Sequence, residues 1–229
     1  MKKIILVLMA LVLAAPFATT ASAQSMTKTQ KVINKQLQKA LKKEYKEKMK
    51  QFKKEGWKLY GSTRSLEVAL LSHYSKLEEL GENGYEVMGE ASKFKSMNVG
   101  KQMAVNNACN QYARQAGSHV KGRIVSDIAG NADDVSAEFD HFYSAYETLV
   151  EKEIKGEMQE SFSVVKDFKD GTHAMQTYFI INEDAATKAR IRAMENALKE
   201  SQAAQKYAKK VSEFVQEGFE KEQDNSKKD

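Results

Sequence analysis

A thiol beside an imidazole is the first arrangement to consider for covalent catalysis, because the chain contains one cysteine and four histidines. Cys109 would be the nucleophile. The candidate bases are His73, His119, His141 and His173. Cys109 lies in a segment whose apolar residues recur at helical spacing, however, and no protease signature surrounds it. A free cysteine in such a segment is usually a small core residue, so we expect Cys109 to be buried and not catalytic.

Carboxylates and histidines at helical spacing are the next candidates, because together they could hold a metal ion. Glu138 and His141 are three residues apart, a spacing that can direct both side chains to one metal. This pair supplies only two ligands, and no second pair of ligating residues lies nearby. Glu78, Glu79 and Glu82 form an acidic cluster without the alternating oxygen ligands of a calcium loop. We therefore expect no metal site.

The familiar catalytic motifs are missing from the chain that follows the first 23 residues. Phosphate-binding glycine loops, serine-hydrolase elbows and zinc-protease helices have recognisable signatures, and none occurs there. We predict that the protein is not an enzyme, that no residue is catalytic and that no cofactor is bound. The remaining candidate for a functional site is a surface defined by charge.

Lysine is concentrated in one segment of the chain. Residues 25–60 contain twelve lysines and three glutamates, whereas the chain after Tyr60 contains 22 basic and 28 acidic residues. Apolar residues recur every three or four positions over residues 27–55, which predicts an amphipathic helix with one narrow apolar stripe. Lysines fill most of the other positions. The interaction surface that we single out on this basic helix consists of Lys35, Lys39, Lys42, Lys43, Lys46 and Lys50.

Three interpretations of the basic helix remain open. Its apolar stripe can pack on the rest of the chain and leave the lysines in water, which is the commonest arrangement for such a helix. The helix can instead lie on the headgroups of an anionic membrane surface. Binding to nucleic acid is the third interpretation, and the export signal described below makes us expect none.

The remaining pattern predicts an α+β fold. We expect short strands at residues 57–60, 85–92, 160–168 and 172–181, which form a small, mainly antiparallel sheet. Asp170-Gly171 favours a two-residue type I′ hairpin turn, with Phe168 opposite His173 and Phe162 opposite Phe179. We expect the long helices to pack on one face of this sheet, with helical N- and C-terminal extensions. The C-terminal helix is expected to begin after Asn182 and to continue to about Phe219.

The first 23 residues have the organisation of a secretory signal peptide. Lys2 and Lys3 precede an apolar stretch over residues 4–15, and Ala21-Ser22-Ala23 is a small-residue cleavage site. We therefore expect cleavage after Ala23 and export, with the periplasm as the location. No lipidation cysteine follows the apolar stretch. The predicted organisation is a signal peptide at 1–23, the basic helix at 24–56, an α+β domain at 57–219 and a disordered charged tail at 220–229.

A family resemblance is carried by the middle of the chain. The short strand YEVMGEAS over residues 85–92 leads into an alanine-rich helix with the sequence AVNNACNQYA over residues 104–113. A second helix, a β-hairpin ending near Ile181 and a helix beginning EDAAT follow in that order. In these features residues 85–198 resemble the LPP-twenty lipoprotein-like family of bacterial envelope proteins. The resemblance implies an α+β domain and an envelope location, and it supplies no catalytic residues.

These observations together predict a function by exclusion. We expect a non-enzymatic exported envelope protein that binds another envelope protein or associates with itself, with an anionic membrane surface as a further partner for the basic helix. The alternative is a periplasmic holdase-type chaperone that uses the basic helical arm to hold unfolded chains. The physiological process and the identity of the partner do not follow from the sequence.

Overall fold

The computed structural model describes residues 28–124 and 139–217, with a few side chains inside these ranges left undescribed. Residues 1–48 and 49–229 form two units, which we treat separately, and helix α1 (Lys28–Glu55) contributes to both. The predicted signal peptide, its cleavage site, the charged tail and Glu138 lie outside the described residues. None of the helices described is both long enough and apolar enough to cross a bilayer.

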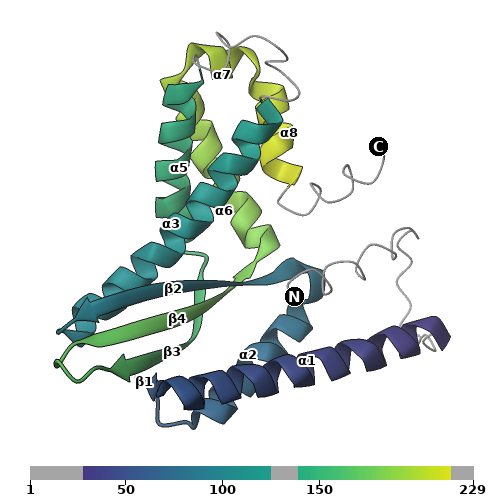
Figure 1. Cartoon of the computed structure of the whole chain (residues 1–229). Coiled ribbons are helices and arrows are strands. Elements are labelled where there is room, and N and C mark those ends of the chain that lie inside the picture. Colours follow the sequence, from purple (N-terminus) through teal and green to yellow (C-terminus); the bar gives the residue numbers. More distant parts are fainter. Residues whose placement is uncertain (1–27, 125–138, 218–229) are drawn as a thin grey trace. The chain divides into compact units, whose positions relative to one another are not determined.

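A four-stranded antiparallel sheet is the centre of the second unit. Its strands are β1 (Lys58–Tyr60), β2 (Gly84–Phe94), β3 (Gln159–Asp167) and β4 (His173–Asn182). Their order across the sheet is β1-β3-β4-β2, so β2 and the very short β1 are the edge strands (Figure 1). The predicted α+β fold with a small antiparallel sheet is therefore confirmed, and each strand lies within about two residues of its expected position.

Helices account for most of the remaining described residues. They are α2 (Leu66–Leu80), α3 (Met97–Ile124), α5 (Asp140–Ile154), α6 (Glu183–Ala197), α7 (Gln202–Lys206) and α8 (Ala208–Glu217), with short 3₁₀ turns at Gly81–Asn83 and Leu198–Glu200. Side-chain caps fix the starts of α2 and α6. Ser65 Oγ accepts a hydrogen bond from Val68 N at 3.2 Å, and Asn182 Oδ1 accepts one from Ala185 N at 3.2 Å.

Helix α3 covers one face of the sheet, and small residues allow its backbone to approach very closely. A Cβ atom on Gly89 of β2 would lie only 1.8 Å from the carbonyl oxygen of Ala104 and 2.8 Å from the backbone nitrogen of Ala108. Only glycine fits at this position. Further along the same helix, the ring of Tyr112 stacks on that of Tyr85 with 6.1 Å between centroids. Strand β2 and helix α3 are thereby held together along most of the strand.

The opposite face of the sheet is covered by α2 and the last turns of α1. Phe52 of α1 makes edge contacts with the rings of Phe162 and Tyr178, with centroids 6.3 and 6.1 Å apart. His73 of α2 is fully buried and contacts the ring of Phe162 at 5.4 Å. The long helix α3 thus lies on one face as expected, and the sheet differs from the expectation in having a second covered face. The sequence pattern did not indicate which face α2 would cover.

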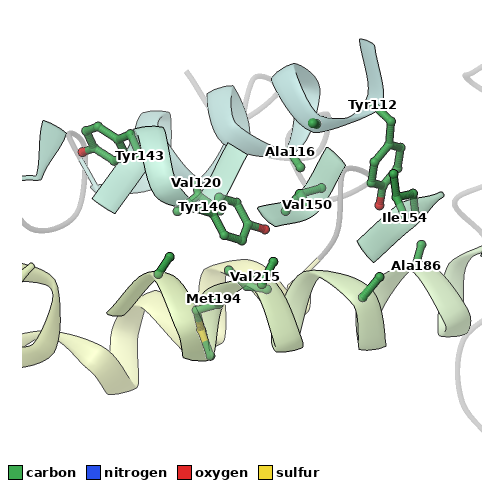
Figure 2. Packing of buried hydrophobic residues seen from close by; sticks show 14 of the residues in the cluster. Tyr112, Ala116, Val120, Tyr143, Tyr146, Val150, Ile154, Ala186, Met194 and Val215 are labelled. Atoms are coloured by element: carbon green, nitrogen blue, oxygen red, sulfur yellow. The ribbon is translucent and has the colours of Figure 1, made fainter. Parts of the chain in front are cut away.

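The largest apolar core lies where α3 continues past the sheet and meets α5, α6 and α8. Figure 2 shows side chains from these four helices turned toward one another. Its largest fully buried members include Tyr112, Tyr146, Phe142 and Ile154. Alanines on α6 complete the packing by allowing close helix contact. This core is separate from the small cluster around Met175 that lies between α3 and the sheet.

The β3–β4 hairpin is present, but its predicted register is wrong by one residue. Asp167 pairs with His173, and Phe162 pairs with Tyr178 instead of Phe179. Phe168 N donates to Thr172 O at 2.9 Å, and Gly171, with φ +76°, donates to Phe168 O at 3.2 Å. This is a three-residue loop with a left-handed glycine, not the predicted two-residue type I′ turn, because Asp170 keeps a negative φ.

The predicted single helix after Asn182 is also wrong, because it is interrupted. Helix α6 ends at Ala197, and a 3₁₀ turn over Leu198–Glu200 follows. Ser201 then adopts an extended conformation, and its hydroxyl accepts from Ala204 N at 3.2 Å to begin α7. The serine thus caps a new helix instead of continuing the old one. The interruption lets α8 turn back so that it packs on both α6 and α3.

Candidate functional site

The six lysines singled out from the sequence all lie on α1, and all six are exposed. At 3.6 residues per turn, their positions fall within about 100° of the helix circumference. We call this surface the lysine face; it consists of Lys35, Lys39, Lys42, Lys43, Lys46 and Lys50. The apolar side chains of α1 follow a different side of the helix, where Met49 and Phe52 are buried. These six lysines are therefore gathered on one side of α1.

Positive charge on the lysine face is poorly neutralised within the part of the chain that the structure describes. Of the six ammonium groups, only Lys43 has a carboxylate within ion-pair distance there, that of Glu47 at 3.9 Å. Both side chains of this pair are largely in water, so the pair contributes little to stability. A row of exposed, uncompensated cations attracts an anionic surface and accelerates its association.

The last turn of α1, which belongs to the second unit, packs against the sheet. Trp57 N donates to Phe52 O at 2.9 Å where the helix ends at Gly56, whose φ is +78°. The indole Nε1 of Trp57 donates to Glu55 Oε2 at 2.9 Å. Lys166 of β3 lies over the indole ring, 5.9 Å from its centroid. The chain therefore passes from helix to β1 through an ordered turn built around the single tryptophan.

Cys109 is buried, as expected. Its side chain lies in the core, and its Sγ atom is 3.6 Å from Met158 Sδ. Burial raises the pKa of its thiol, which disfavours the reactive thiolate. Two of the histidines proposed as a base bind carboxylates instead: His73 Nε2 lies 2.6 Å from Glu86 Oε2, and His173 Nδ1 lies 2.8 Å from Asp167 Oδ1. The described contacts of Cys109 thus do not form a cysteine–histidine pair.

The other candidate ligands are not brought together among the described residues. Glu138 lies outside those residues, and its predicted partner His141 is exposed. Glu79 pairs with Lys76 at 3.0 Å on the outer side of α2, and the side chain of Glu82 is not described. In the ranges 28–124 and 139–217 no group of three or more histidine, cysteine or acidic side chains is arranged to hold a metal ion.

A serine–lysine pair is present that sequence reasoning missed. Lys101 Nζ of α3 donates to Ser163 Oγ of β3 at 2.6 Å, and Ser163 Oγ is 3.0 Å from Thr177 Oγ1. Serine–lysine pairs can act in acyl transfer when the amine is neutral. Here Lys101 also forms an ion pair with the carboxylate of Glu160, and Ser163 is only 1% exposed, which leaves a substrate little access to its hydroxyl. We interpret the cluster as a buried polar contact that holds α3 on the sheet.

A buried arginine network was also not anticipated. Arg190 of α6 is 1% exposed; its Nη1 donates to the Tyr112 hydroxyl at 2.6 Å, and its Nη2 binds the Glu183 carboxylate at 2.5 Å. Burial opposes its charge, but Tyr112 and Glu183 together hold the pKa of Arg190 above its usual value. Its Nε donates to Val215 O of α8 at 3.3 Å. Residues up to 78 positions apart meet here, so no local sequence signal could reveal the network.

Comparison with known proteins adds no further information about the site. Neither the models of protein families, nor the curated proteins, nor the solved structures contain a match to this chain. The function must therefore be argued from the residues and the geometry described above.

Proposed function

We propose that the protein is a non-enzymatic binding protein of the bacterial envelope whose lysine face contacts an acidic partner protein. The observation that carries the proposal is the one-sided row of six exposed lysines on α1, of which one has a carboxylate within 4 Å among the described residues. An envelope location is supported by the signal-peptide organisation of residues 1–23 and by the resemblance of residues 85–198 to an envelope family.

An acidic protein is a better partner for the lysine face than a membrane into whose acyl chains the helix would have to insert. At 1.5 Å per residue, the 28 residues of α1 span about 40 Å, which allows several cations to contact one partner at once. None of the large apolar side chains that are exposed in the described residues belongs to α1. Binding would therefore depend on complementary charge, which sets specificity and association rate and weakens with salt.

Cross-linking in cells tests this proposal directly. A photoreactive residue at Lys39 or Lys46 is expected to form one or a few discrete adducts with envelope proteins. The matched control is the same residue at Gln51, which is exposed on a different side of α1 and is expected to give little adduct. An adduct with a second copy would identify self-association as the contact. Recovery of free monomer alone from every position on the lysine face contradicts the proposal.

Variants that change the charge of the lysine face test whether binding depends on the charge of these side chains or on their shape. Replacing Lys35, Lys39, Lys42 and Lys46 by Glu is expected to weaken the complex by about tenfold or more, since a loss of about 1.4 kcal/mol already corresponds to that factor. Arg at the same four positions keeps the charge and is expected to keep the adduct. Equal adduct yields from the Glu and Arg variants would exclude an electrostatic contact.

A holdase-type chaperone is the second candidate, and exposed apolar groups on α2 favour it. Val68 is 46% and Leu71 is 49% exposed, and Leu71 borders an open depression lined also by Ser72 and Ser75. Such groups can hold unfolded chains weakly. The purified protein should then suppress aggregation of an unfolded envelope protein, and Val68→Ser/Leu71→Ser should abolish that effect. Unchanged suppression by this variant would exclude α2 as the holding surface.

A further inference from the structure

Helix α3 contains an uncharged stretch in a chain that is otherwise rich in charge. Charged residues make up 29% of the whole sequence. The segment 102–113, with the sequence QMAVNNACNQYA, contains none, and no acidic residue occurs anywhere in Met97–Ile124. One side of this segment packs on β2 and in the large apolar core. Its exposed side therefore lacks the charged groups that usually cover a solvated helix face.

Amides and two apolar side chains form one continuous stripe on this exposed side. At 3.6 residues per turn, positions 99, 103, 106 and 110 fall within about 60° of the helix circumference, and successive members are three or four residues apart. Val99 is 52% and Met103 is 42% exposed. Asn106 is exposed, and Asn110 is half-buried. We call these four residues, together with the adjoining exposed Gln102, the amide stripe.

The amides of the stripe are not explained by the fold. On the neighbouring side of α3, Asn107 Nδ2 donates to Glu90 O at 2.7 Å and closes the edge of β2. The side chains of Gln102, Asn106 and Asn110 form no such hydrogen bond with any described residue. Asparagine is also a poor helix former, and exposed positions inside a long helix are better filled by other residues. Its recurrence here indicates that these amides serve a contact with another molecule.

The chemistry of the stripe is self-complementary. A side-chain amide carries both donors and an acceptor, so it can pair with the same amide of another molecule. A two-fold interface brings the same surface of two copies together, and a charged group near the axis would there meet its like. A stripe without charge avoids this repulsion. Val99 and Met103, four residues apart, supply apolar groups that a second helix can bury.

Other kinds of partner fit the stripe less well. A strongly acidic or basic protein would be recognised by complementary charge, which the stripe lacks. A small ligand would need a concave site, whereas the stripe follows the convex outer side of a helix. A second copy of the same uncharged helix face meets both conditions.

We propose that a second copy of this chain covers the amide stripe, so that two α3 helices pack face to face about a two-fold axis. Met103 and Asn106 lie nearest the middle of the stripe, so each lies close to the same residues of the second copy. The apolar side chains interdigitate, and the amides pair across the contact. The stripe is only about 17 Å long, so the contact is smaller than that of a permanent dimer, and we expect dissociation in the micromolar range.

Sedimentation velocity of the purified mature chain over a range of concentrations tests the proposal. The average mass is expected to rise toward that of a dimer and to change little with salt, because no ion pair crosses the contact. A contact through the lysine face would instead weaken with salt. A monomer at every concentration, or a dimer that dissociates when salt is added, would overturn the proposal.

Opposite charges at one position distinguish loss of the contact from unfolding. Met103→Asp and Met103→Lys should each weaken the dimer by about tenfold or more, because like charges then face each other across the axis. An equal mixture of the two variants should restore dimerisation, which unfolded variants could not do. The matched controls are Leu71→Asp and Leu71→Lys on α2, where Leu71 is 49% exposed, and both should dimerise like the original protein. No recovery on mixing, or loss of the dimer in the α2 variants, would overturn the proposal.

The amides have an effect of their own that a structural role would not produce. Asn106→Ala/Asn110→Ala should raise the melting temperature of the monomer, because alanine is the better helix former. The same variant should weaken the dimer by about fivefold or more, because the paired amides are lost. Gln115→Ala, at an exposed position on another side of α3, is the matched control and should leave dimerisation unchanged. Undiminished dimerisation of the double alanine variant would overturn the proposal.

Discussion

Gly89 shows how a single residue without a side chain determines the packing of α3 on the sheet. The backbone of α3 occupies the space in which a Cβ atom of residue 89 would lie, with the Ala104 oxygen only 1.8 Å away. Backbone atoms inside a long helix cannot move aside locally. The whole helix would have to shift, and the stacked pair Tyr85–Tyr112 would shift with it.

Gly89→Ala is therefore expected to destabilise the fold by about 2–3 kcal/mol or more, as for overpacking of a core. Urea unfolding followed by circular dichroism measures the change. Gly122→Ala is the matched control, since Gly122 lies inside the same helix and a Cβ atom added there would have nothing within 4 Å. That change should stabilise the protein by about 0.5–1 kcal/mol. Equal stability of the two variants would show that α3 can move away from β2 at little cost.

Arg190 is the residue on which three helices depend, because its guanidinium joins α6, α3 and α8. Arg190→Met leaves the carboxylate of Glu183 near the core without its cation and is expected to cost about 3–5 kcal/mol. The double variant Arg190→Met/Glu183→Gln should regain part of that loss, because no charge is left unpaired. Thermal unfolding compares the two. A double variant no more stable than the single one would indicate that packing, not charge, carries the effect.

At the scale of elements, the β3–β4 hairpin shows what the sequence could and could not predict. Alternation of apolar residues located both strands, and Asp170-Gly171 located the turn. The register depends on whether the loop has two or three residues, and the dipeptide alone does not decide this. Here Asp170 Oδ1 accepts from Thr172 N at 3.0 Å, which favours the three-residue loop. The one-residue difference placed Phe162 opposite Tyr178.

Gly171 is the residue in this loop whose conformation requires a positive φ, +76°. Gly171→Ala is expected to cost about 1–2 kcal/mol, and Gly171→Asn less, because asparagine tolerates the left-handed region better. Chemical denaturation of both variants measures the difference. If alanine and asparagine cost the same, the loop must rearrange instead of retaining the observed turn.

Across the whole molecule, features that depend on local periodicity could be predicted and features that depend on strand pairing could not. The lysine face follows from residues at helical spacing within one segment, and all six members are exposed on α1. The pairings of Lys58 with Val165 and of Phe94 with His173 join segments that only the order of the strands brings together. The contact between Lys101 and Ser163, 62 positions apart, has the same origin.

Buried tyrosines distributed through the second unit make the fold sensitive to alkaline pH. Burial raises the pKa of Tyr85, Tyr112, Tyr146 and Tyr178, and it raises the pKa of Tyr143 to about 12. The folded state thus binds these phenolic protons more tightly than the unfolded state. Their contribution to stability is complete below the ordinary pKa of 10.0 and declines as the pH rises above it.

We therefore expect loss of helical circular dichroism above about pH 10 to coincide with the appearance of tyrosinate absorbance from these buried rings. Tyr146→Phe should move the transition to higher pH, because the buried Tyr146 hydroxyl has no hydrogen-bond partner among the described residues and its removal costs little. Complete tyrosinate formation while the helices stay intact would contradict this expectation.

The turn around Trp57 gives the protein a built-in optical reporter. The chain has one tryptophan, and its indole is held between the end of α1, through Glu55, and strand β3, through Lys166. Its fluorescence therefore originates from a single place, the junction of the basic helix with the sheet. Any event that displaces the last turn of α1 from the strands should change the emission of the unlabelled protein, so a titration with a binding partner can be followed without introducing a dye.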